Sequence, residues 1–152
     1  VDAAGLTGRV ELAPVEMSPE QYLFFVDDSA IARKEIMMTL DKLAVPYQQA
    51  SNGNEAWEKL QNLAARAQHD GMPVSNLISV ILTDAEMPEM DGYVLTKKIK
   101  SDRRFEGIPV VMHSSLSSDA NRSMGKTVGV DAYVAKFDPT VLAETLRPLL
   151  MR

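Results

Sequence analysis

The sequence predicts an α/β protein, a doubly wound parallel sheet in which five strands alternate with five helices. Short apolar runs alternate with longer segments whose apolar residues recur every three or four positions. Two of the runs, at 77–83 and 108–112, are apolar almost throughout, as expected for strands covered on both faces. Acidic, hydroxyl and basic residues follow the runs, at the sheet edge where folds of this class bind ligands.

The first half of the alternation is a strand at 22–26, a helix, a strand at 45–50 and a second helix. The first helix is expected to begin after Ser29, a good N-cap residue. A proline and two glutamines within 45–50 favour a position at the sheet edge. The inward faces of the helices are Ile36, Leu40 and Leu43 in the first, and Ala56, Leu60, Leu63, Ala64 and Ala67 in the second.

The second half continues the same alternation. Its expected elements are a strand at 77–83, a loop at 84–92, a helix at about 93–101, a strand at 108–112, a helix near 119–128 and a strand at 132–135. Asp138 and Pro139 open a last helix as its N-cap and first helical residue. Pro148 lies inside this helix and removes a backbone donor, so a kink or an early end is expected there.

Length and composition are typical of a single domain that needs no disulfide or other cross-link. The chain has 152 residues, 45% of them apolar, which is enough for a full core. Its 16 basic and 21 acidic residues give a net charge of −5, which argues against a nucleic-acid-binding face. Cysteine is absent, which suits a reducing compartment, and no apolar run approaches the roughly 20 residues of a membrane span. We therefore expect a cytoplasmic protein with no nucleic-acid partner and no membrane insertion.

The first 20 residues differ from the rest of the chain. They contain two glycines and two prolines and show no sustained hydrophobic period, as in a linker or the tail of a preceding domain. The chain starts at Val1 rather than at methionine, which fits a processed chain or a fragment of a longer one. The compact domain is expected at 21–152.

Charged and hydroxyl side chains gather where the strands end. Asp27 and Asp28 follow the first strand, Asp84 the third, Ser114 the fourth and Lys136 the fifth. Three carboxylates that converge without a cation would raise one another's pKa values and cost stability. A hard divalent ion removes that repulsion, and few protein ligands plus several waters suit Mg²⁺. The sequence therefore predicts a magnesium site at this edge.

The same constellation suits phosphoryl transfer. Lys136 and the metal would neutralise charge on the transferred group while a carboxylate attacks in line. Asp84 is the best candidate nucleophile because it ends the central buried strand and precedes a tight loop that can wrap the site.

Here the chain resembles the receiver domain of two-component response regulators, over about residues 21–151. The residues that carry the resemblance are Asp27 and Asp28, the motif Asp84-x-x-Met87-Pro88-x-Met90-Asp91-Gly92, Ser114 and Lys136. The resemblance implies a flavodoxin-like fold with strand order 2-1-3-4-5 and helices on both faces. It also implies that Asp84 accepts phosphate from a histidine kinase, and that catalysis extends no further than self-catalysed phosphorylation and autodephosphorylation.

The resemblance assigns further roles. Asp28 would bind Mg²⁺ directly and Asp27 through water, with the carbonyl of Glu86 as another ligand. Ser114 and Tyr133 would be the switch hydroxyl and the switch aromatic. One departure concerns the residue after Lys136. Most receivers have a cis proline there, whereas Phe137 stands at this position and a trans bond is expected.

A second departure narrows the resemblance. Ser114 and Ser115 replace the usual Thr-Ala pair, and the runs at 112–117 and 135–139 resemble the receiver half of a chemotaxis coupling protein (CheV-like). In that family a kinase-coupling domain precedes the receiver. The implied partners are a chemotaxis histidine kinase and, through an upstream coupling domain, chemoreceptors.

Two other functions compete with the phosphorylation switch. A Mg²⁺-dependent phosphohydrolase with an aspartate nucleophile needs a second acid two residues later, where Glu86 stands, and a cap for which no insertion is long enough. A receiver-like interaction domain that is never phosphorylated usually lacks one of the acids or the lysine, all of which are present here. His113 is expected to be a packed strand-end histidine with a satisfied ring.

Overall fold

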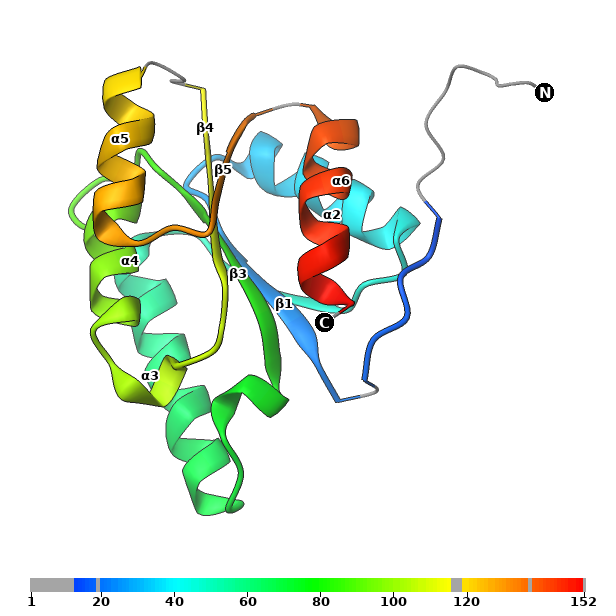
Figure 1. Cartoon of the computed structure of the whole chain (residues 1–152), viewed down its shortest axis with the longest axis vertical. Coiled ribbons are helices and arrows are strands. Elements are labelled where there is room, and N and C mark those ends of the chain that lie inside the picture. The colour runs from blue at the N-terminus through cyan, green and yellow to red at the C-terminus, as the bar shows by residue number, and fades with distance from the viewer. Residues whose placement is uncertain (1–12, 19, 116–118, 137, 152) are drawn as a thin grey trace.

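The computed structural model describes residues 13–18, 20–115, 119–136 and 138–151. Within these ranges the chain forms one parallel sheet with strand order β2-β1-β3-β4-β5, which confirms the doubly wound architecture and the 2-1-3-4-5 order (Figure 1). The strands are β1 (Tyr22–Val26), β2 (Tyr47–Ala50), β3 (Ile78–Asp84), β4 (Val110–Ser114) and β5 (Ala132–Ala135).

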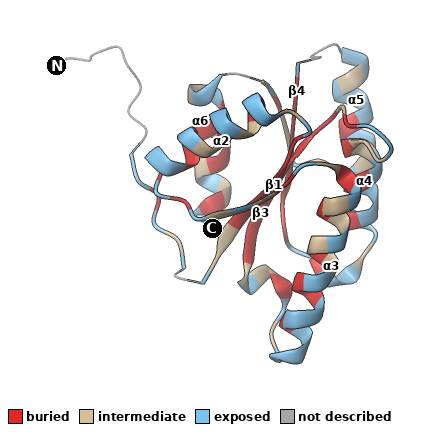
Figure 2. Ribbon diagram, turned by 180° about the vertical axis from the view of Figure 1, so that it is seen from behind, coloured by how far each residue is buried: buried red, intermediate tan, exposed pale blue. Residues whose placement is uncertain are grey.

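Helices cover both faces of the sheet (Figure 1). One face carries α2 (Ala30–Lys42) and α6 (Pro139–Leu150), and the other carries α3 (Gly53–His69), α4 (Gly92–Lys100) and α5 (Asp119–Val128). Two short 3₁₀ turns, Val74–Asn76 and Arg103–Phe105, complete the described elements. The central strands separate two apolar cores. Figure 2 shows the buried residues along the strands and on the neighbouring helices. No helix in the described ranges is long and apolar enough to cross a membrane.

Capping residues set the helix starts as the sequence predicts. The Ser29 side chain accepts the Ala32 N–H at the start of α2, and Asp138 caps α6 with Pro139 in its first turn. The prediction that α6 ends early at Pro148 is wrong, because the helix continues to Leu150. Pro148 lies in the last turn, where a missing N–H costs a single hydrogen bond.

Strand β4 begins and ends two residues later than expected. Pro109 has no N–H to donate, and only its carbonyl joins the sheet, by accepting the Ile81 N–H at 3.0 Å. At its other end β4 includes His113 and Ser114, and both are buried. Strand β3 likewise extends to include Asp84 as its last residue, whereas β2 is shorter than expected and begins only at Tyr47.

Part of the expected linker packs against the domain. Val15 is buried in the core beneath α2 and α6, and its N–H donates to the Leu43 carbonyl at 2.8 Å. Arg147 of α6 donates to the Ala13 carbonyl at 3.0 Å. Residues 1–12 and the bond between Lys136 and Phe137 lie outside the described residues.

Candidate functional site

The carboxyl ends of the strands bring the expected side chains to one edge. Asp27 directly follows β1, and Asp84 ends β3 opposite His113 of β4. Ser114 ends β4, and its carbonyl accepts the Lys136 N–H at 3.0 Å just beyond β5. Because the strands are parallel and in register here, residues more than 100 positions apart share one site.

Three carboxylates and one ammonium form the centre of the site. Asp27, Asp28 and Asp84 each offer an oxygen within 4.8 Å of the others. The Nζ atom of Lys136 lies 2.9 Å from Oδ1 of Asp84 and 3.1 Å from Oδ2 of Asp27. Asp27 and Asp84 are fully buried, whereas Asp28 is exposed at the rim. The predicted convergence of Asp27, Asp28, Asp84 and Lys136 is therefore present.

The electrostatics of the cluster favour an added cation. Burial and the charge on Asp27 raise the pKa of Asp84 while Lys136 lowers it, and the net result is a pKa of about 7. Burial alone would lower the pKa of Lys136, but its ion pairs with Asp84 and Asp27 outweigh that effect and raise it. Among the described residues, the Lys136 ammonium thus pairs with two of the three carboxylates, Asp27 and Asp84.

The donor set of this cluster fits a hard divalent ion. The Oδ2 atom of Asp84 is buried and has no hydrogen-bond partner among the described residues, whereas Oδ2 of Asp27 has only its ion pair with Lys136. Buried carboxylate oxygens without a partner are costly unless a cation or water meets them. All three candidate ligands are carboxylates, the chemistry that Mg²⁺ prefers.

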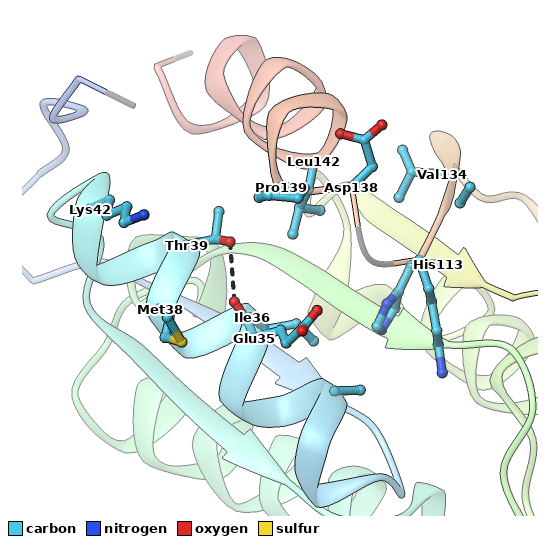
Figure 3. A pocket seen from close by; sticks show the side chains of 13 residues that line it. Glu35, Ile36, Met38, Thr39, Lys42, His113, Val134, Asp138, Pro139 and Leu142 are labelled. Atoms are coloured by element: carbon cyan, nitrogen blue, oxygen red, sulfur yellow. Dashed lines mark hydrogen bonds between the residues drawn. The ribbon is translucent and has the colours of Figure 1, made fainter. Parts of the chain in front are cut away.

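His113 lies beneath the acids. It is packed as expected, with 4% of its surface exposed. The expectation of a satisfied ring is wrong for Nε2, which lies 3.4 Å from Oδ2 of Asp27 and has no hydrogen-bond partner among the described residues. Burial and the nearby Lys136 charge lower the pKa of His113 to about 3, so the ring is neutral at physiological pH. It also lines a cavity of about 250 Å³ between α2 and α6 (Figure 3).

The loop after β3 holds Asp84 in place. The Glu86 N–H donates to Oδ1 of Asp84 at 3.2 Å. Gly92, which opens α4 after its cap Asp91, packs directly on the Asp84 carbonyl, since a Cβ atom there would lie 2.0 Å from that oxygen. Only glycine allows this approach. The role expected for the Glu86 carbonyl, as a metal ligand, remains a prediction.

The side chain of Glu86 has a role that sequence reasoning missed. Ser114 donates its hydroxyl hydrogen to Oε2 of Glu86 at 2.6 Å. The sequence suggests for Glu86, two residues after Asp84, only a carbonyl ligand or the second acid of a hydrolase. Its place in the loop beside the end of β4 was the available signal.

The expected switch aromatic, Tyr133, has neighbours that the sequence did not suggest. Its half-buried ring fits against Gly125, where a Cβ atom would lie 3.1 Å from the ring. Its hydroxyl lies 3.5 Å from the Tyr93 hydroxyl. Arg122 donates to the Tyr133 carbonyl at 3.2 Å, with its guanidinium 5.1 Å from the ring centre. The Tyr93 hydroxyl also contacts the Asn121 carbonyl at 3.3 Å, which links α4 to α5.

Comparisons with known proteins agree with this geometry. Residues 23–147 match the response regulator receiver domain. The chain is 38% identical over 130 residues to the chemotaxis protein CheY1 of Helicobacter pylori, covering 84% of this chain and 95% of that protein. It is 34% identical over 131 residues to the chemotaxis protein CheV3 of the same organism, covering 86% of this chain. The chain spans 41% of the length of CheV3.

A solved structure shows the same fold. The receiver domain of the histidine kinase CKI1 from Arabidopsis thaliana, complexed with Mg²⁺ and BeF₃⁻, matches with a TM-score of 0.72 and 27% identity. The match covers 85% of this chain and 89% of that one. With this fold and acidic edge, and with the receiver match over 23–147, the chain belongs to the response regulator receiver domains, the phosphorylation-switched modules of two-component signalling.

Proposed function

We propose that Asp84 is the phosphoacceptor of a Mg²⁺-dependent transfer from a histidine kinase. The observation that carries the proposal is the position of Asp84, buried at the end of β3 with Lys136 at 2.9 Å and two further carboxylates beside it. Phosphorylation of an aspartate by a histidine kinase is a property of the response regulator receiver family. The assignment to this residue is ours.

The chemistry follows from the side chains. The Asp84 carboxylate attacks phosphorus in line, a new O–P bond forms, and the P–N bond to the donor imidazole breaks with its electron pair leaving on nitrogen. Lys136 neutralises charge on the transferred oxygens. Asp27, Asp28, Asp84 and the Glu86 carbonyl would hold Mg²⁺, which supplies further charge neutralisation when bound. The Mg²⁺ complex of the CKI1 receiver supports this choice of ion.

The proposed readout uses Ser114 and Tyr133. An aspartyl phosphate presents oxygens that accept from the Ser114 hydroxyl and from Lys136. Moving Ser114 inward opens space beside β4, into which Tyr133 turns. That change would remodel the face made by α5, β5 and α6, where a partner reads the state.

The pathway proposed is chemotaxis. Two of the similar proteins, CheY1 and CheV3, are chemotaxis proteins by name. The partners proposed are a chemotaxis kinase and, for a chain of the CheV type, chemoreceptors reached through a coupling domain. The phosphohydrolase alternative is not favoured, because the residue that it needs as an acid, Glu86, instead accepts the hydroxyl of Ser114.

Phosphorylation by a small donor tests the acceptor. The protein is incubated with acetyl phosphate and Mg²⁺, and intact mass is recorded. We expect the mass of one phosphoryl group on the wild type and none on Asp84→Asn. The control is Asp41→Asn, because Asp41 is exposed near the C-terminal end of α2. This variant should be phosphorylated normally. A full adduct on Asp84→Asn would reject the assignment.

Calorimetry tests the metal site separately. We expect Mg²⁺ to bind in the micromolar-to-millimolar range, because only a few protein ligands are available and water completes the shell. Asp28→Ala should weaken this binding by about tenfold or more, since one of three carboxylates is lost. Equal affinities in the two proteins would remove Asp28 from the ligand set.

A further inference from the structure

The short bond between Ser114 and Glu86 joins the switch hydroxyl to a carboxylate outside the acid cluster. The two oxygens are 2.6 Å apart, typical of a hydroxyl that donates to an ionised acceptor. Such bonds are stronger than those between neutral groups. Ser114 is buried and Glu86 is half-buried, so water competes poorly for either partner.

This bond conflicts with the role proposed for Ser114. A serine hydroxyl has one hydrogen to donate. While that hydrogen is donated to Glu86 it is not available to a phosphoryl oxygen on Asp84. Activation therefore has to break one charge-assisted bond in order to form another.

The segment that follows β3 also contacts Tyr133, the second proposed switch residue. Glu86 and Tyr93 line one hollow at the mouth of the site, together with Asp28. The Tyr93 hydroxyl contacts Tyr133, and the Glu86 carboxylate holds Ser114. Both switch side chains are thus in contact with the segment that follows β3.

We propose that Glu86 is a positioning residue that holds Ser114 in the resting state and so sets how readily phosphorylation is converted into the switched state. The inference rests on the proposed function and deepens it. Every activating event must break the bond between Ser114 and Glu86, which costs free energy. A receiver with a neutral side chain at this position would switch more readily.

A double-mutant cycle separates this bond from simple charge repulsion. The affinity for beryllofluoride, a phosphoryl mimic, is measured with saturating Mg²⁺ on the wild type, Glu86→Gln, Ser114→Ala and the double variant. Glutamine keeps the size of the side chain but accepts a weaker bond, so Glu86→Gln should bind about fivefold more tightly than the wild type. In the Ser114→Ala background the same change should gain less than about twofold.

A control and a second readout complete the experiment. Glu89→Gln removes a charge from the same loop, where Glu89 is exposed and contacts Asn54 rather than Ser114, so its affinity should change less than about twofold. The ring signals of Tyr133 in NMR spectra should shift in unliganded Glu86→Gln toward their position in the beryllofluoride complex.

Three outcomes would overturn the inference. An equal gain in both backgrounds would show that Glu86 acts through charge alone. Weaker binding of Mg²⁺ and beryllofluoride by Glu86→Gln would show that its carboxylate supports the metal. Wild-type protein that fails to bind beryllofluoride would refute the proposed function itself, and this inference with it.

Discussion

Helices α5 and α6 lie on opposite faces of the sheet and follow its last two strands, β4 and β5. The two helices nevertheless bury very different amounts of apolar surface. Helix α6 buries Leu142, Ala143, Leu146 and Leu150. In α5, all of whose residues are described, Gly125 is the only buried residue. Full burial of a leucine contributes roughly 1.5–3 kcal/mol, and a glycine contributes no side chain at all. The free energy that keeps α6 in place is thus largely absent from α5.

The contacts of α5 come instead from polar and aromatic groups. Arg122 lies over Tyr133, and the Asn121 carbonyl meets the Tyr93 hydroxyl. Contacts of this kind are individually weak and have alternatives in water. The comparison teaches that Tyr133, the proposed switch aromatic, lies beside the less firmly packed of the two helices, where a small change at the site would meet little resistance.

The largest expected effect concerns amide hydrogen exchange. Beryllofluoride with Mg²⁺ should change exchange rates in α5 by about fivefold or more and those in α6 by less than about twofold, because little buried surface resists a shift of α5. Asp84→Asn should abolish the change in both helices. Equal responses in α5 and α6 would contradict the comparison.

The next effect concerns stability. Leu146→Ala in α6 should lower the free energy of unfolding by about 2–4 kcal/mol, because Leu146 is fully buried in the core. Met124→Ala in α5 should change it by less than about 0.5 kcal/mol, since Met124 is 53% exposed. Urea denaturation followed by circular dichroism measures both. Comparable losses would show that α5 is anchored as firmly as α6.

A third effect depends on pH and concerns Asp84. Burial raises the pKa of Asp84 to about 7 in the folded protein, so the folded state binds this proton more tightly than the unfolded chain does. The resulting stability is complete below about pH 4 and is lost as pH rises towards 7. Without Mg²⁺, the wild type should lose about 1–3 kcal/mol more than Asp84→Asn between pH 4 and 8. Parallel profiles for the two proteins would contradict this.

The smallest effect sharpens the role of Gly125. Gly125→Ala should raise helix propensity but press on the Tyr133 ring, which lies 3.1 Å from the new Cβ position. The two effects oppose each other, so stability should change by less than about 1 kcal/mol while the Tyr133 ring signals shift. Ser123→Ala, at an exposed position of α5, is the control and should leave those signals unchanged. Unshifted Tyr133 signals in Gly125→Ala would show that the ring does not depend on the glycine.

Strong local signals explain which parts of the fold were predictable. Strand β1, the Ser29 cap and the Asp138–Pro139 start of α6 appear where expected, because an apolar run and two capping motifs each specify a local structure. The ends of β4 were misplaced because hydropathy alone does not reveal that Pro109 starts the ladder late. The burial of Val15 was also missed, since its segment has no hydrophobic period.

The candidate site was predictable to a similar degree. The convergence of Asp27, Asp28, Asp84 and Lys136 follows from strand ends in a parallel sheet, which topology alone determines. The bond from Ser114 to Glu86 depends on a side-chain rotamer in a loop, and no sequence period reports that. The contacts of Tyr133 with α5 were missed for the same reason.

The packing of residues 13–18 against the domain limits how far any segment joined ahead of them can extend from it. An extended chain covers roughly 3.3–3.6 Å per residue, so fixing these six residues shortens a flexible tether by roughly 20 Å. Val15 and the bond from Arg147 to Ala13 hold the segment beside α2 and α6. Anything joined ahead of it is confined to a smaller volume on that side, which raises its effective concentration there.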